Sequence, residues 1–138
     1  MARPKVLVTR PIAQQALDMV AAETDMKLWT GELPPPRDWL LREVGDIGGL
    51  LSLLTEQVDK ELLAAAHELK VISNMAVGYD NVDVAEATRR GIVVGNTPGV
   101  LTETTADLTF ALLLAAGRRI AEADSYIRQG KWQTWDPM

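Results

Sequence analysis

The segment Ala76-Val77-Gly78 holds the residues best suited to bind an anion through the main chain. It follows the apolar run 69–73 after two intervening residues, and it carries only small or apolar side chains. Backbone N–H groups that converge in such a segment form a site for a carboxylate. The polar residues Asp80, Asn81 and Asp83 suit a turn and the cap of the next helix. A plain turn is the alternative interpretation, and spacing alone leaves both open.

A second candidate site is the segment Asn96-Thr97-Pro98-Gly99, together with the hydroxyl-rich residues 102–105 that open the following helix. A helix N-terminus that carries hydroxyl groups suits a phosphate or an amide-bearing ligand. Ordinary capping of the helix by Thr102 or its neighbours is the alternative. The position of this segment after a predicted strand is the same as that of residues 76–78.

Groups for acid–base or nucleophilic catalysis are scarce in the sequence. The single histidine, His67, is predicted in the middle of a helix, away from any strand end. The sequence has no G-x-G-x-x-G, no P-loop and no cysteine, and its one histidine rules out a well-placed Ser/His/Asp set. The strands predicted to end at Thr9 and Leu54 offer no paired carboxylates for a metal pocket. The 76–78 segment therefore has no acid–base partner in this sequence.

The composition is that of one globular domain with a real core. The 138 residues are 47% hydrophobic and 24% charged, and the net charge is −5. This acidic balance argues against a nucleic-acid partner, and no basic amphipathic segment suits a membrane surface. The N-terminal apolar run is too short for a signal peptide, and residues 108–117 are too few to span a bilayer. We expect a soluble, cytoplasmic protein.

Alternating strands and helices position these segments. Short apolar runs predict five strands, at 5–9, 25–29, 46–54, 69–73 and 92–94. Helical spacing and caps predict four intervening helices, at 12–22, 38–44, 60–69 and 83–91. Asp59 is the expected N-cap of the third, Asp83 and Glu86 form an expected capping box, and Gly91 is an expected left-handed end. The pattern predicts an α/β fold, a doubly wound parallel five-stranded sheet with helices on both faces.

The helix predicted from residue 101 to 117 differs from the others because its apolar residues do not keep to one stripe. A helix that is apolar nearly all round needs cover nearly all round. Its six large apolar side chains represent about 10 kcal/mol of burial. One sheet surface cannot supply this cover, so the helix implies a second domain or a second subunit. A further helix is predicted at 120–129.

The run from Asn74 to Trp132 strongly resembles the D-isomer-specific 2-hydroxyacid dehydrogenases, and most closely their glyoxylate/hydroxypyruvate reductase branch. VGYDNVD, NTPGVLTETTAD and RRIAEAD carry the resemblance in this order and spacing. It covers residues 45–138, and residues 1–44 fit in outline. The resemblance implies a flavodoxin-like substrate domain over 1–100 that lacks its C-terminal returning segment. Residues 101–138 would then form inter-domain and dimerisation helices and the start of a dinucleotide-binding domain.

The resemblance also implies roles for single residues. Val77 and Gly78 match residues whose backbone amides hold the substrate carboxylate, and Leu53 matches a residue of the substrate pocket. Trp135 matches a tryptophan that reaches the active site of the neighbouring subunit. Thr105, with Thr104 as the alternative, lies in the segment that approaches the nicotinamide side of NAD or NADP.

The activity implied is reduction of a small 2-oxo acid, such as glyoxylate or hydroxypyruvate, by NADH or NADPH in a homodimer formed through residues 101–138. The family's G-x-G-x-x-G and its catalytic Arg, Glu and His would come after residue 138. We therefore expect no catalytic residue, no metal, no turnover and no tight cofactor binding in this chain alone. A dinucleotide-sensing corepressor and a stand-alone dimerisation module are the alternatives. Trp135 and the VGYDNVD loop favour the enzyme, and a peptide-docking groove would favour the corepressor.

Overall fold

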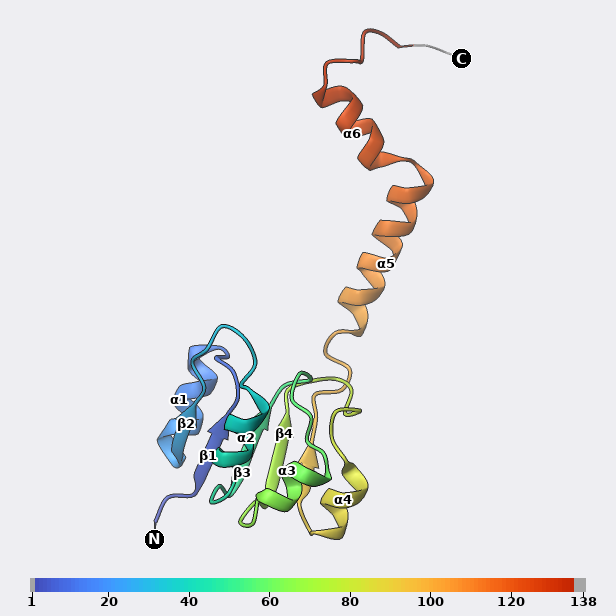
Figure 1. Cartoon of the computed structure of the whole chain (residues 1–138). Helices are drawn as coiled ribbons and strands as arrows, with labels where there is room; N and C mark the ends of the chain where they lie inside the picture. The colour runs from blue at the N-terminus through green and yellow to red at the C-terminus, as the bar shows by residue number, and fades with distance from the viewer. Residues whose placement is uncertain (1, 136–138) are drawn as a thin grey trace. The chain divides into compact units, whose positions relative to one another are not determined.

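The structure, a computed structural model, describes residues 2–135. The chain divides into two compact units, Met1–Gly99 and Val100–Met138. The first unit contains a parallel sheet and the helices α1 to α4, and the second contains α5 and α6 (Figure 1). Residues 136–138, the end of the predicted dimerisation segment, lie outside the described residues.

The sheet of the first unit confirms the predicted α/β class and the doubly wound parallel topology. Its strand order is β2-β1-β3-β4-β5, and every neighbouring pair is parallel. The strands are β1 (Lys5–Val8), β2 (Asp25–Leu28), β3 (Gly49–Ser52), β4 (Val71–Asn74) and β5 (Val93–Gly95). The last two begin later than predicted. The amide of Ile92 donates to Ala87 O over 2.9 Å and so closes the preceding helix instead of joining the sheet.

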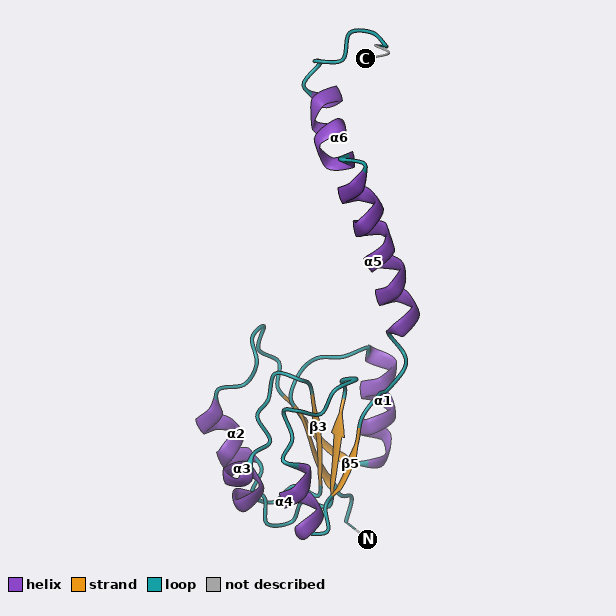
Figure 2. Ribbon diagram, turned by 90° about the vertical axis from the view of Figure 1, so that its right-hand side faces the viewer, coloured by secondary structure: helices purple, strands orange, loops and turns teal. Residues whose placement is uncertain are grey.

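Helices cover the two faces of the sheet unequally (Figure 2). The helices α2 (Arg37–Glu43), α3 (Lys60–Ala65) and α4 (Val84–Arg89) lie on one face, and α1 (Gln14–Glu23) lies on the other. The core lies between the sheet and the three helices, and its fully buried members include Leu7, Leu50, Leu62, Leu63 and Ile72.

The strand register explains how one face becomes fully buried while the other does not. Leu7 pairs with Leu50, and Leu50 pairs with Ile72, so these side chains line the same face. On the opposite face Gly49 pairs with Val71, and Val71 pairs with Val93. Val71 is 44% exposed and Val93 is 66% exposed. The β4–β5 side of this second face is therefore open in the chain as it stands.

The predicted helix caps are largely confirmed. Asp59 accepts a hydrogen bond from the amide of Leu62 over 3.0 Å, and Asp83 accepts one from the amide of Glu86 over 2.9 Å. Gly91 has the expected left-handed backbone, with φ of 73°. Only half of the predicted capping box forms, because the Asp83 amide donates to Val58 O over 2.9 Å and is not available to Glu86.

The prediction that α3 continues to residue 69 was wrong. The helix ends at Ala65, and His67 lies exposed in the turn that follows, not in the middle of a helix. The Lys70 amide already donates to Gly48 O over 2.9 Å. A helix that reached residue 69 would leave no residues for the turn that leads into β4.

The second unit consists of α5 (Thr102–Gly117) and α6 (Ile120–Arg128). Neither helix has a buried residue. Leu101, the neighbour of Thr102, is the N-cap of α5, and it makes no side-chain capping bond. Among the described residues, no helix is both long and apolar enough to cross a membrane.

Candidate anion-binding site

The candidate site lies where β3, β4 and β5 end. Ser52 pairs with Asn74 across β3 and β4, and Ser73 pairs with Gly95 across β4 and β5. The segments that follow these strands therefore leave the same edge of the sheet. In open α/β sheets, ligands bind outside the carboxyl ends of the strands. We refer to residues 75–81, which follow β4, as the anion loop.

A buried polar network ties the anion loop to the sheet. Ser52 and Asn74 have no exposed surface, and Ser52 Oγ lies 3.1 Å from Asn74 Oδ1. Asn74 Nδ2 donates to Asn81 Oδ1 over 3.0 Å. Asn81 Nδ2 in turn donates to the carbonyls of Leu53 and Glu56, over 3.0 and 2.9 Å. Asn81 therefore holds the anion loop against the segment that follows β3.

Glu56 fixes that neighbouring segment. Its carboxylate is 3% exposed and accepts hydrogen bonds from Thr9 Oγ1 and from the Leu53 amide, both over 2.7 Å. Thr55 Oγ1 lies 2.6 Å from its other oxygen. A buried carboxylate needs such donors, because an unpaired one is costly. Leu53, the predicted pocket residue, is thereby held directly after β3 with its side chain half-buried.

Sequence reasoning missed Glu56 and Asn74 as parts of this site. Asn74 carried a signal, because it follows Ile72 at the two-residue spacing of a buried strand face, where an apolar residue is expected. A polar residue at such a position needs a buried partner. Glu56 carried no comparable signal, since its donors come from the residue after β1 and from a neighbouring turn.

The amides of Val77 and Gly78 are free to bind a ligand. Within residues 2–135, neither N–H donates an intramolecular hydrogen bond. Both residues are exposed, and Val77 has 41% of its surface accessible. An exposed amide without an internal acceptor is left to water or to a ligand. This arrangement is the one that the anion-binding interpretation requires.

Gly78 has no evident conformational reason to be glycine. Its φ is not in the left-handed region, unlike that of Gly91. A Cβ at this position would meet Asp80 Oδ2 at 3.7 Å, which is ordinary van der Waals contact. A glycine that neither the backbone angles nor the neighbours require is consistent with close approach of another molecule to the main chain.

The other two predicted site residues belong to the second unit. Thr105 lies in the first turns of α5, where its amide donates to Leu101 O over 3.0 Å. Its carbonyl accepts a bond from Thr109 Oγ1 over 2.7 Å, and its side chain is exposed. Trp135 follows α6 and is 75% exposed.

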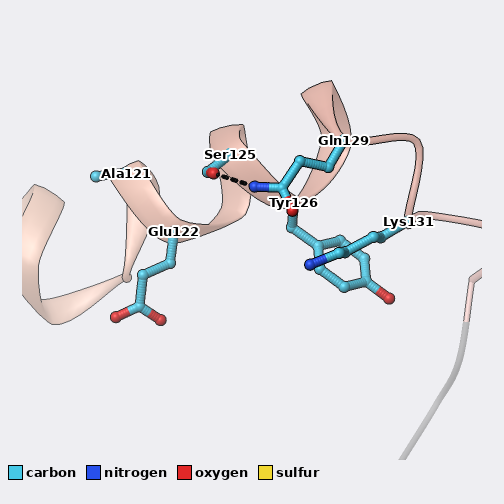
Figure 3. A pocket seen from close by; sticks show the side chains of 6 residues that line it. All are labelled: Ala121, Glu122, Ser125, Tyr126, Gln129 and Lys131. Carbon is cyan, nitrogen blue, oxygen red and sulfur yellow. Dashed lines mark hydrogen bonds between the residues drawn. The ribbon is translucent and has the colours of Figure 1, made fainter.

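A hollow of about 410 Å³ lies along α6 (Figure 3). It is lined by Ala121, Glu122, Ser125, Tyr126, Gln129 and Lys131. Gln129 Nε2 donates to Ser125 Oγ over 2.8 Å, so these two groups satisfy each other. One exposed helix and the residues after it cannot enclose a small molecule, and we assign no catalytic role to this hollow.

Comparison with protein families identifies the family. The family model described as D-isomer specific 2-hydroxyacid dehydrogenase, catalytic domain, matches residues 6–134. The chain belongs to this family. The matched range contains Leu53, Val77, Gly78 and Thr105, and Trp135 lies directly after it.

Curated relatives in the D-2-hydroxyacid dehydrogenase family are much longer than this chain. A glyoxylate reductase of Korarchaeum cryptofilum is 51% identical over 137 residues, which cover 99% of this chain and 41% of that protein. A glyoxylate reductase of Thermococcus litoralis is 50% identical over 140 residues, with coverages of 99% and 42%. The chain thus spans about two fifths of the length of these relatives.

Solved structures agree with the family assignment. A protein of Thermus thermophilus matches 96% of this chain with a TM-score of 0.85 and 43% identity, over 43% of its own length. An NADPH-dependent glyoxylate/hydroxypyruvate reductase of Sinorhizobium meliloti, in complex with NADP and malonate, matches 99% of this chain. Its TM-score is 0.71 and its identity is 32%, over 43% of its length.

Proposed function

We propose that this chain is the substrate-binding part of an oxidoreductase that reduces a small 2-oxo acid to the D-2-hydroxy acid with NADH or NADPH. The proposal rests chiefly on the free amides of Val77 and Gly78 at the carboxyl edge of the sheet. Relatives named glyoxylate reductase, and one named glyoxylate/hydroxypyruvate reductase, support glyoxylate or hydroxypyruvate as the substrate. Their similarity to this chain extends over nearly all of it.

In this proposal the substrate carboxylate accepts hydrogen bonds from Val77 N–H and Gly78 N–H. Hydrogen bonds to an ionised acceptor are stronger than those between neutral groups, and they need no cationic side chain. Leu53 borders the pocket that receives the rest of the substrate. Trp135 enters the active site of a second subunit. All four roles follow the family resemblance.

The cofactor we propose is a nicotinamide dinucleotide. The Sinorhizobium meliloti relative is a complex with NADP. In this chain only Thr105, or Thr104 beside it, is proposed to approach the nicotinamide. The 138 residues contain no glycine-rich phosphate loop, so the donor set present here does not suit a dinucleotide by itself. We assign phosphate binding, and the catalytic Arg, Glu and His, to other parts of the whole protein.

The domain division we propose is a substrate domain over 1–100 and a segment of inter-domain and dimerisation helices over 101–138. The open side of the sheet around Val71 and Val93 suits cover by a returning segment of the whole protein. The chain alone is then expected to show no NADH- or NADPH-dependent reduction of glyoxylate. Reduction of glyoxylate by the purified 138-residue chain would contradict this assignment of the catalytic residues to other parts of the protein. A cytoplasmic location belongs to the same proposal.

We infer that residues 101–138 form a homodimer contact. Large apolar side chains on every side of α5 are exposed, among them Leu108, Phe110, Leu112, Leu113 and Leu114. Each is at least 59% exposed. Contiguous apolar surface of this kind marks a site of association. A second copy of the chain supplies an identical apolar helix.

The binding proposal is tested by titrating the isotope-labelled chain with glycolate and with glycolamide while following its amide resonances. The two molecules have the same shape, but only glycolate is an anion. We expect glycolate to shift the Val77 and Gly78 amide signals saturably, and glycolamide to leave them in place. Equal responses to both molecules, or no response at these amides, would contradict the proposal.

A further inference from the structure

Three successive carbonyl groups of the anion loop are hydrogen-bonded, although the adjoining amides are free. Ala76 O accepts from the Thr97 amide over 2.9 Å. Val77 O accepts from Asn96 Nδ2 over 2.8 Å, and Gly78 O accepts from Asn74 Nδ2 over 3.1 Å. The loop is therefore anchored by its carbonyl groups, and the N–H groups of Val77 and Gly78 remain available to a ligand.

The first two of these bonds fix the direction of the free amides. The described peptide bonds are all trans, and in a planar trans peptide the C=O and the following N–H point opposite ways. The carbonyls of Ala76 and Val77 are both drawn to the segment Asn96-Thr97. The N–H groups of Val77 and Gly78 must then both point away from that segment, toward the same side. In an extended strand, successive N–H groups would point to opposite sides.

Free amides also occur elsewhere in the anion loop, so the lack of an intramolecular acceptor does not by itself define the site. In the described part of the chain, the amides of Tyr79, Asp80 and Asn81 donate no intramolecular bond either. Their peptide planes are not held by a common partner segment. The pair at Val77 and Gly78 is distinguished by two anchors from one segment, which turn both amides toward the same side.

We propose that Asn96 is a positioning residue for the substrate carboxylate, which it orients without touching. Its carboxamide holds the Val77–Gly78 peptide plane, so that the Gly78 N–H lies parallel to the Val77 N–H and both reach one anion. This inference rests on the proposed function. It assigns a specific role to the Asn96-Thr97 segment, which sequence reasoning left open between ligand binding and helix capping.

Asn96 and Thr97 provide a matched pair for testing this role. Asn96 acts through its side chain, whereas Thr97 acts through its backbone amide, and its exposed hydroxyl makes no hydrogen bond among the described residues. Asn96→Ala removes the anchor. Asn96→Leu removes it while keeping a side chain of similar volume. Thr97→Ala keeps the backbone anchor and changes a neighbouring polar side chain, so it serves as the control.

The experiment titrates the labelled 138-residue chain and the three variants with glycolate. It follows the amide signals of Val77 and Gly78 and the carbonyl carbon signal of Val77. Loss of one hydrogen bond predicts about a three- to tenfold rise in Kd for both Asn96 variants. The Val77 carbonyl signal should move in these two variants before any ligand is added. Thr97→Ala should bind glycolate like the wild type.

The outcomes separate this inference from the proposed function. If the wild type binds and both Asn96 variants bind equally well, the positioning role is overturned while the carboxylate site stands. If Asn96→Leu alone binds normally, the side chain acts through packing, and the inference is also overturned. Unfolding of both Asn96 variants would assign a purely structural role and overturn it as well. If the wild type does not bind glycolate, the proposed function fails, and the inference fails with it.

Discussion

At the scale of the residue, Gly78 separates the two interpretations of the loop after β4. A turn that needed glycine would place it at positive φ, but Gly78 has an ordinary φ and room for a Cβ. The sequence alone could not settle this point, because glycine is typical of both turns and binding loops. The family resemblance, and not the residue pattern, indicated the Val77 and Gly78 amides, because the direction of these amides depends on where the Ala76 and Val77 carbonyls find donors.

The substitution Gly78→Ala should therefore affect binding and stability in opposite directions. At an unstrained position, alanine raises the free energy of unfolding by about 0.4–1 kcal/mol through the unfolded chain. The added methyl group would obstruct a carboxylate that approaches the main chain. Thermal unfolding and glycolate titration of the same sample measure both effects. A variant that loses stability and keeps full affinity would favour the plain turn.

Glu86 carries the clearest electrostatic prediction in the first unit. The Arg90 guanidinium, with Arg89 beside it, holds the pKa of the Glu86 carboxyl below its ordinary value. Glu86 is 3% exposed and accepts from Arg90 Nε over 2.5 Å, and Arg90 also donates to Leu63 O over 2.8 Å. This cluster links α4 to α3.

A carboxyl whose pKa is lowered in the folded protein stabilises the fold above its unfolded pKa, about 4.3 for glutamate. That contribution is lost as the pH falls through the lower pKa of the folded state. Glu86→Gln should thus lower the unfolding temperature most near neutral pH, and the difference from wild type should shrink in acid. Glu23→Gln, at an exposed position on α1, is the control. A difference that grows in acid would contradict the assignment.

At the scale of the element, local sequence determined helix starts better than helix ends. Asp59 and Asp83 cap α3 and α4 as predicted, because a cap depends on residues three apart. The end of α3 depends instead on a distant contact, the bond from the Lys70 amide to Gly48 O. The alanine-rich pattern around His67 contains no sign of that contact.

The helix α3 also tests how the first unit is held together. Leu62 has no exposed surface and belongs to the core between α3 and the sheet. Leu62→Ala should lower the free energy of unfolding by about 2–5 kcal/mol, because it removes apolar contact and leaves a cavity. Leu33→Ala makes the same chemical change at a position that is 77% exposed. Denaturant unfolding should show a large loss of unfolding free energy for Leu62→Ala and little change for Leu33→Ala.

At the scale of the whole molecule, the sequence predicted that α5 needs cover from outside its own sheet. Leu108, Phe110 and Leu113 are exposed in the structure, so these side chains still lack the predicted cover. What covers α5 could not be deduced from the helix alone. Its apolar side chains lie on all sides and do not indicate one face for contact. The chain belongs to a dehydrogenase family and spans about two fifths of the length of its relatives. The cover that we propose for α5 is therefore a second copy of the chain and further parts of the whole protein.

The assembly proposal predicts that the purified chain is at least a dimer by light scattering. Phe110→Asp should shift it toward monomer, since a charge in an apolar contact is costly to bury. Ala22→Asp introduces the same charge on exposed α1 and should leave the mass unchanged. A monodisperse wild-type monomer would contradict the dimer, without affecting the carboxylate site.

The most direct test of the central claim is a crystal structure of the chain with oxalate, a small acid that carries two carboxylates and no ketone to be reduced. We expect one carboxylate with its oxygens about 2.7–3.2 Å from the nitrogens of Val77 and Gly78. We also expect the Val77 carbonyl to keep its bond to Asn96. Oxalate bound only elsewhere, with both amides facing water or internal acceptors, would show that these amides are not a carboxylate site.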